Sequence, residues 1–196
     1  MPIVVSRPPS GQPRWHGTPS ACPREHALRY CPTMRGGTEE AARLIEAGER
    51  DGAERVLLGL LEEHPEDARA NYLMASLCDQ SDQERRAVPF YQRALAGVED
   101  LPEEDAAGAY VGLGSTQRAL GEHEESLRVL LDGLERFPHD RALSTFLALT
   151  LYNLGEHRET VSTLLKNLVE TTADPGIRLY GRALAFYADR LDETFE

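Results

Sequence analysis

Few stretches of this 196-residue chain combine residue types that could do chemistry. Gly112-Leu113-Gly114-Ser115 is faintly like a phosphate-binding loop, but no Lys-Ser or Lys-Thr follows it and no strand is expected before it. We interpret its glycines as points of close helix packing. Cys22, His26 and Cys31 lack a fourth ligand at the spacing of a zinc site. The sequence therefore predicts neither a phosphate site nor a metal site.

The other titratable groups also have structural explanations. Glu103, Glu104 and Asp105 come just before an expected helix, where negative charge suits the helix dipole. His123 and His157 fall at equivalent turns of a repeated unit, which makes them surface residues. No nucleophile is paired with a base along the sequence. We therefore expect a non-catalytic protein with no cofactor.

Small residues recur at a regular interval and indicate what positions these groups. Intervals of 34, 39 and 34 residues separate Ala41, Ala75, Gly114 and Ala148. Twelve residues after each stand Ala53, Ala87, Ser126 and Thr160. A turn residue keeps the same register at Gly48, Asp82, Gly121 and Gly155. A period near 34 is typical of stacked helix–turn–helix repeats.

Hydrophobic spacing predicts nine helices. Their expected ranges are 38–48, 51–63, 68–80, 83–97, 105–120, 123–136, 141–154, 157–171 and 176–191. The leucines at three- and four-residue spacing are expected to fill the space around the small residues. They are Leu113, Leu120, Leu130, Leu147, Leu154 and Leu164.

Helix boundaries follow from proline, aspartate and glycine. Pro65 and Pro138 cannot continue the helices before them, because proline lacks an N–H and clashes with the preceding turn. Asp67 and Asp140 are expected to cap the helices that follow. Gly121 and Gly155 stand where a left-handed residue ends a helix. Pro89 lies inside an expected helix and predicts a kink near residues 85–88.

Charge is unevenly distributed. The net charge is −12, but residues 1–36 carry +4 and the remainder carries −16. A body this acidic is not expected to bind nucleic acid, because phosphate contacts need clustered Lys and Arg. No run of 18 apolar residues predicts a membrane span. Cys78 falls at a core position as a free thiol, and the three cysteines form no disulfide framework, so a reducing, cytoplasmic setting is expected.

Residues 1–36 are rich in Pro and Arg and have no helical periodicity, which predicts disorder. Our preferred hypothesis is that translation begins at Met34 and that the preceding residues are a start-site artefact. The alternative is a basic tail that folds back on the acidic body. The predicted domain spans residues 37–196.

The repeated residues resemble the tetratricopeptide repeat family. The best-matching unit begins at Ala107 and carries Tyr110, Leu113, Gly114, Leu120, Gly121, Ser126, Leu130, Gly133 and Pro138. The first unit is weaker, since Gly37 and Glu40 replace the aromatic and the leucine. The stretches GLGSTQRALGE, FLALTLYNLGEH and AFYADRLDE look like the small stand-alone bacterial proteins of group 5, whose functions are mostly unassigned.

This resemblance implies an all-α, right-handed α-solenoid of about four helix–turn–helix units. Residues 177–191 repeat only a first helix and are expected to cap the last apolar face. Five extra residues around positions 97–102 are expected to lengthen a loop or to extend the next helix backward.

The resemblance also implies that the first helices of the pairs line a concave groove. Its inward positions would be Arg69, Tyr72, Ser76, Asp79, Gln80, Ser115, Arg118, Thr145, Leu149, Tyr152, Asn153, Arg182, Phe186 and Arg190. Arginine pairs with carboxylates and tyrosine supplies rigid contact area, so the expected ligand is an acidic or C-terminal peptide segment.

The predicted function is a protein-interaction scaffold, with two alternatives. One is self-assembly into a homo-oligomer through the weakly packed first unit. The other is a small-molecule sensor or enzyme, which requires Arg118, Tyr152 and Phe186 to converge on a deep apolar pocket. Recognition of chaperone tails is not supported, because the Lys and Asn clamp of such binders is absent at Thr38, Ala42, Tyr72 and Ser76.

Overall fold

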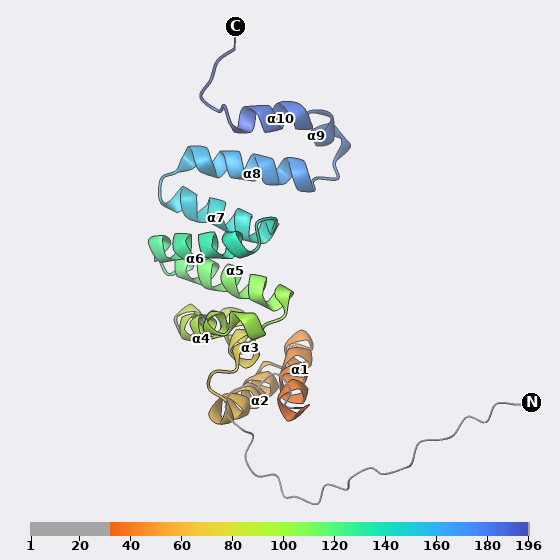
Figure 1. Ribbon diagram of the computed structural model, residues 1–196, viewed down its shortest axis with the longest axis vertical. Coiled ribbons are helices and arrows are strands. Elements are labelled where there is room, and N and C mark those ends of the chain that lie inside the picture. The colour runs from red at the N-terminus through yellow and green to blue at the C-terminus, as the bar shows by residue number, and fades with distance from the viewer. Residues whose placement is uncertain (1–31, 196) are drawn as a thin grey trace, which may run out of the picture. The chain divides into compact units, whose positions relative to one another are not determined.

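The computed structural model describes residues 32–195, and these form an all-α array (Figure 1). Its elements are α1 (Pro32–Glu46), α2 (Arg50–Glu63), α3 (Ala68–Asp79), α4 (Glu84–Ala96), the short 3-10 helix η2 (Val98–Asp100), α5 (Glu103–Ala119), α6 (His123–Arg136), α7 (Arg141–Asn153), α8 (His157–Thr171), α9 (Pro175–Leu179) and α10 (Gly181–Ala188). The all-α prediction is confirmed. None of these helices is both long and apolar enough to cross a membrane.

The helices pack as consecutive hairpins. α1 packs on α2, α3 on α4, α5 on α6 and α7 on α8, and we name these pairs repeats one to four. Each pair also contacts the next, and α10 packs on α8 (Figure 1). Each element is therefore held mainly by its sequence neighbours, as in a repeat array.

Small residues bring the two helices of a hairpin together, as the period predicted. Ala41, Ala53, Ala75 and Ala87 are fully buried. In repeat three, a Cβ added to Gly114 would lie 2.5 Å from Cγ of Leu130 on α6. That distance leaves no room for a side chain, so glycine sets how closely α5 and α6 approach.

Two hydroxyls reinforce the same contact. Ser126 Oγ donates to the carbonyl of Gly114 at 2.7 Å, and Thr160 Oγ1 lies 3.2 Å from the carbonyl of Ala148. Both pairs are twelve residues apart. The recurring interval therefore marks where the second helix crosses the first.

The turn chemistry matches the prediction. Gly121 and Gly155 have φ of 82° and 88°, and Asp82 takes up the same left-handed region with φ of 54°. Asp67 accepts a hydrogen bond from the backbone N–H of Ala70 at 2.6 Å, and Asp140 from that of Leu143 at 2.8 Å. These carboxylates satisfy N–H groups that have no partner within the helix.

Some boundaries differ from the prediction. α1 begins at Pro32, so residues 32–36 are helical. Residues 1–31, including Cys22, His26 and Cys31, lie outside the described part of the chain, as do both hypotheses for that segment. Three of the residues around 97–102 form η2 (Val98–Asp100), and α5 begins two residues earlier than expected. α4 continues through Pro89 without a break.

Two predictions at the C-terminal end are wrong. The capping helix expected over 176–191 is divided into α9 and α10, with Tyr180 (φ −100°, ψ 7°) between them. Leu164, expected in the core, has 37% of its surface exposed. The break leaves α9 short, and the face of α8 that carries Leu164 is only partly covered.

Candidate partner-binding surface

The first helices of the repeats form a continuous layer. α1 contacts α3, α3 contacts α5 and α5 contacts α7, whereas within the described residues any contact between α2 and α4, α4 and α6, or α6 and α8 is weaker. A layer in which alternate helices touch is the more tightly spaced side of the array. The free side of α3, α5 and α7 is therefore the candidate partner-binding surface, which we call the groove face.

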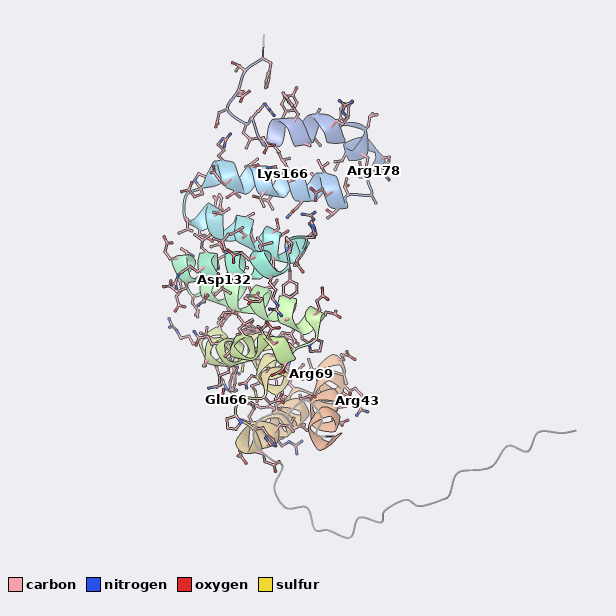
Figure 2. The ribbon with its side chains drawn as sticks, in the orientation of Figure 1. Arg43, Glu66, Arg69, Asp132, Lys166 and Arg178 are labelled. Atoms are coloured by element: carbon pink, nitrogen blue, oxygen red, sulfur yellow. The ribbon has the colours of Figure 1, made fainter. Side chains whose placement is uncertain are left out.

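The N-terminal part of the groove face is tied together by its own side chains. Arg69 on α3 (Figure 2) pairs with Asp105 on α5 at 3.2 Å. Tyr72 packs against Gly108, where an added Cβ would lie 2.5 Å from the phenol oxygen. Burial raises the pKa of Tyr72, and the nearby carboxylates of Asp105 and Glu104 raise it further. Arg69 and Tyr72 therefore join α3 to α5 as well as facing the groove.

Asp79 hydrogen-bonds to side chains of the neighbouring helices. Its carboxylate accepts from the hydroxyl of Tyr91 at 3.0 Å and from that of Thr116 at 2.9 and 2.8 Å. Burial raises the pKa of Asp79, although both hydrogen bonds lower it in part. Since α3, α4 and α5 meet at this carboxylate, its oxygens are engaged within the fold. A partner contact by Asp79 stays a prediction.

Arg118 has the most available charge on the groove face. Its Nη1 donates to Oδ1 of Asn153 at 3.2 Å, which links α5 to α7. Within residues 32–195, no carboxylate forms an ion pair with Arg118, and its buried Nε has no hydrogen-bond partner. A neutral amide leaves the guanidinium charge uncompensated, so this side chain can pair with an anion from outside.

The neighbouring helix α7 has exposed apolar side chains. Tyr152 is 60% exposed, with its ring centroid 5.0 Å from that of His157, and Leu149 is 37% exposed. Ser115 donates to the carbonyl of Gly112, and Ser76 accepts from the exposed side chain of Gln80. Arg118 and Asn153 thus meet near the C-terminal ends of α5 and α7, and the exposed ring of Tyr152 is on the last turn of the same α7.

Other predicted residues lie apart from this group. Thr145 accepts from Nδ2 of Asn167 on α8, so its hydroxyl serves its own hairpin. Phe186 on α10 contacts Tyr187 and Phe195, and the guanidinium carbon of Arg190 lies 4.2 Å from its ring centroid. Arg182 is exposed on the same helix.

The convergence required for a small-molecule pocket is not observed in these contacts. Tyr152 makes its ring contact with His157, and Phe186 with Tyr187 and Phe195. Two cavities of the described chain are lined by other residues.

Sequence reasoning missed Gly108, the residue of α5 on which Tyr72 packs. Gly112 has the packing role that was predicted, because a Cβ there would lie 2.3 Å from the Tyr91 ring. Helix packing therefore explains this glycine within α5.

A family model described as "Tetratrico peptide repeat" matches residues 68–191. The chain belongs to the tetratricopeptide repeat family. The match begins at α3 and leaves out repeat one, which carries the weakest form of the repeat pattern. Tetratricopeptide repeat domains generally mediate protein–protein interactions.

Comparison with other proteins adds little beyond the family. No curated protein matches this chain. Among solved structures, it is similar to one described as "Functional Characterization of Pseudomonas Aeruginosa pilF", with 16% sequence identity and a TM-score of 0.38. The similarity covers 81% of this chain and 91% of that one.

Proposed function

We propose that this tetratricopeptide repeat protein is a non-catalytic scaffold that binds a segment of a protein partner on the groove face of α3, α5 and α7. The observation that carries the proposal is Arg118, whose guanidinium meets the amide of Asn153 and no carboxylate of the described chain. Tyr152 and Leu149 supply exposed apolar area on the adjoining helix.

This combination favours an acidic ligand. A guanidinium can form two parallel hydrogen bonds with a carboxylate, and such charge-assisted bonds are stronger than neutral ones. Tyrosine and arginine are also the residue types that most often dominate binding energy at interfaces. The ligand is therefore an acidic side chain or a C-terminal carboxylate, followed by an apolar residue that packs on Tyr152.

Selection from a random peptide library, followed by fluorescence polarisation, tests the proposal. We expect selected peptides to be acidic and to bind Arg118→Gln about tenfold more weakly. Arg128→Gln is the matched control, because Arg128 is exposed on α6 and, among the described residues, its ion pair is with Glu125. Peptides that bind both variants as well as the unaltered protein would place binding elsewhere. Circular dichroism verifies that each variant is folded.

Self-assembly is a second candidate. The sequence predicted it through the first repeat, but the observation that favours it lies at the C-terminal end of the array. Leu179, Tyr180 and Tyr187 are 76%, 63% and 48% exposed at the C-terminal end of the described array. Sedimentation velocity over a wide concentration range tests it. A size that rises with concentration, and that Leu179→Ser abolishes, would support this candidate, whereas a constant monomer would remove it.

A reducing, cytoplasmic setting is part of the same proposal. It is supported by Cys78, a free thiol with 2% of its surface exposed. Burial raises the pKa of this thiol, which disfavours the reactive thiolate.

A further inference from the structure

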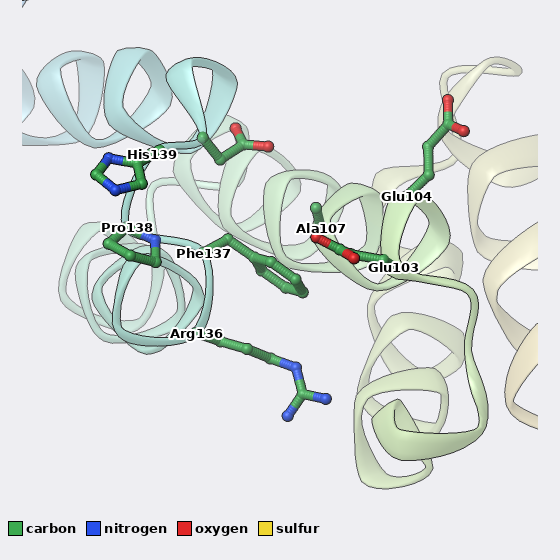
Figure 3. Close-up of a pocket in the computed structure, with 8 residues that line it drawn as sticks. Glu103, Glu104, Ala107, Arg136, Phe137, Pro138 and His139 are labelled. Atoms are coloured by element: carbon green, nitrogen blue, oxygen red, sulfur yellow. The ribbon is translucent and has the colours of Figure 1, made fainter.

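A cavity of about 520 Å³ lies away from the Arg118 group, between the beginning of α5 and the turn that joins α6 to α7. Phe137 and Pro138 line it from the turn, and Glu103, Glu104 and Ala107 line it from α5. Figure 3 shows the Phe137 ring pointing toward Ala107 and the Glu103 carboxylate. The cavity therefore combines an aromatic wall with a carboxylate rim.

The charges around this cavity do not balance. Arg136 is the basic residue of the lining, and both its terminal nitrogens donate to Glu99, at 2.6 and 3.0 Å. Glu103 and Glu104 are exposed and form no ion pair with a described residue. Asp140 uses one oxygen to cap α7 and forms no ion pair with a described residue. The lining thus contains three carboxylates that have no ion pair with a described residue, and its Arg136 is already paired with Glu99.

We propose that this cavity receives an arginine side chain of a protein partner. A guanidinium is planar, stacks on an aromatic face and pairs with carboxylates through several donors, so it fits both the Phe137 wall and the Glu103–Glu104 rim. Lysine offers a compact ammonium without the planar stacking. The Phe137 ring makes an edge contact with Tyr110, with centroids 6.4 Å apart, and the guanidinium carbon of Arg136 lies 5.7 Å from its centroid. The wall is therefore fixed in place and already carries one guanidinium contact, from Arg136.

The arginine-binding proposal does not depend on the groove proposal, but the distance between the two sites can be estimated along α5. Glu104 and Arg118 are fourteen residues apart on the same helix, α5, which corresponds to about 21 Å. An extended peptide covers that distance in about six or seven residues. A partner that used both sites would carry an arginine and an acidic residue at about that separation.

Nuclear magnetic resonance of the full chain tests the cavity with a small probe. N-acetyl-arginine amide is titrated at constant ionic strength and pH 7.5, where histidine is mostly neutral. We expect saturable shifts at the backbone amides of Ala107, Phe137 and His139, and smaller shifts with N-acetyl-lysine amide. N-acetyl-glutamate amide should leave these amides unchanged.

Two pairs of substitutions make the test specific. Glu103→Gln with Glu104→Gln should weaken arginine binding about fivefold. Glu124→Gln with Glu125→Gln is the matched control, since it removes two charges from the first turn of α6, outside the cavity lining. Phe137→Leu should abolish the preference for arginine over lysine.

The inference is overturned if the arginine probe gives no saturable shift, if lysine binds equally well, or if both glutamate pairs weaken binding to the same extent. These outcomes differ from failure of the groove proposal. That proposal is tested by Arg118→Gln with acidic peptides, and the cavity test leaves Arg118 unaltered.

Discussion

Repeats three and four have the same pattern, yet they bury it to different degrees. Leu130 on α6 is fully buried, whereas Leu164, at the equivalent position on α8, is 37% exposed. In repeat three, Gly133 admits Leu143 of the following α7, because an added Cβ would lie 2.9 Å from a Leu143 methyl. In repeat four, Asn167 stands at that position and hydrogen-bonds Thr145 of its own hairpin. The helix that follows a repeat, as much as the repeat itself, therefore determines how deeply its leucines are buried.

The polar contacts between repeats differ as well. Between repeats two and three, Thr116 meets the carboxylate of Asp79. Between repeats three and four, Thr150 meets the hydroxyl of Ser126 at 2.9 Å. Equivalent threonines thus face a charge at one junction and a neutral group at the next. The two junctions should therefore respond differently to pH.

The largest effect should come from truncating the buried leucine. Leu130→Ala removes a fully buried side chain and leaves a cavity, so we expect a loss of about 3 kcal/mol in the free energy of unfolding. Leu164→Ala should lose about 1 kcal/mol, because its side chain is already partly in water. Urea unfolding followed by circular dichroism measures both. Equal losses would contradict the difference between the two repeats.

Gly114→Ala should follow in size. The added methyl would meet Leu130, and overpacking of this kind costs about 1–3 kcal/mol, against about 1 kcal/mol gained from helix propensity. In the Leu130→Ala background the methyl has room, so the same change should become stabilising. A double-mutant cycle measures this reversal. Additive effects would show that the two residues do not compete for space.

The pH dependence of Asp79 comes next. Its folded pKa is raised, chiefly by burial, so the folded state holds this proton more tightly than the unfolded chain does. Stability contributed by Asp79 is therefore present at low pH and is lost as pH rises from about 4 through the folded pKa. Asp79→Asn removes this loss and keeps an acceptor for Thr116.

Urea unfolding at a series of pH values provides the measurement. The difference in stability between Asp79→Asn and the unaltered protein should grow with pH over that window and then level off. Thr150→Val, at the neutral junction, should show a difference from the unaltered protein that does not vary with pH. A difference for Asp79→Asn that is also independent of pH would contradict the assignment.

The smallest effect should come from the turns. Asp82 has a positive φ that glycine adopts at no steric cost, so Asp82→Gly should stabilise the protein by about 0.5 kcal/mol. The reverse change at the equivalent turn, Gly155→Asp, should destabilise it by about 1 kcal/mol. Thermal unfolding midpoints compare the pair. Shifts of the same sign would mean that the two turns are not equivalent.

Local rules predicted most of the fold. The small residues at 34-residue spacing, the aspartate caps and the left-handed glycines all lie where the pattern placed them, because each acts within one hairpin. The break at Tyr180 and the exposure of Leu164 were not predicted. Both depend on how closely α9 and α10 approach α8, which no single helix encodes.

The candidate site was predictable only in part. The repeat register predicted that Arg118 and Tyr152 lie on the first helices of their pairs, and they lie on α5 and α7. It did not reveal that Asp79 is engaged by Tyr91 and Thr116, because those partners come from different helices. The cavity beside Phe137 also went unnoticed, since its walls come from two segments of the chain, residues 103–107 and 136–140.

The hydroxyls of Ser126 and Thr150 have a consequence for how the array opens. Thr150 can donate to Ser126, which donates to the carbonyl of Gly114, so one buried chain of hydrogen bonds runs from α7 through α6 to α5. Both side chains are fully excluded from water. Separating repeat four from repeat three would break the bond between Thr150 and Ser126 and open this buried chain to water. Slow amide hydrogen exchange should therefore extend across α5, α6 and α7 as one cooperative unit, with α9 and α10 exchanging independently of it.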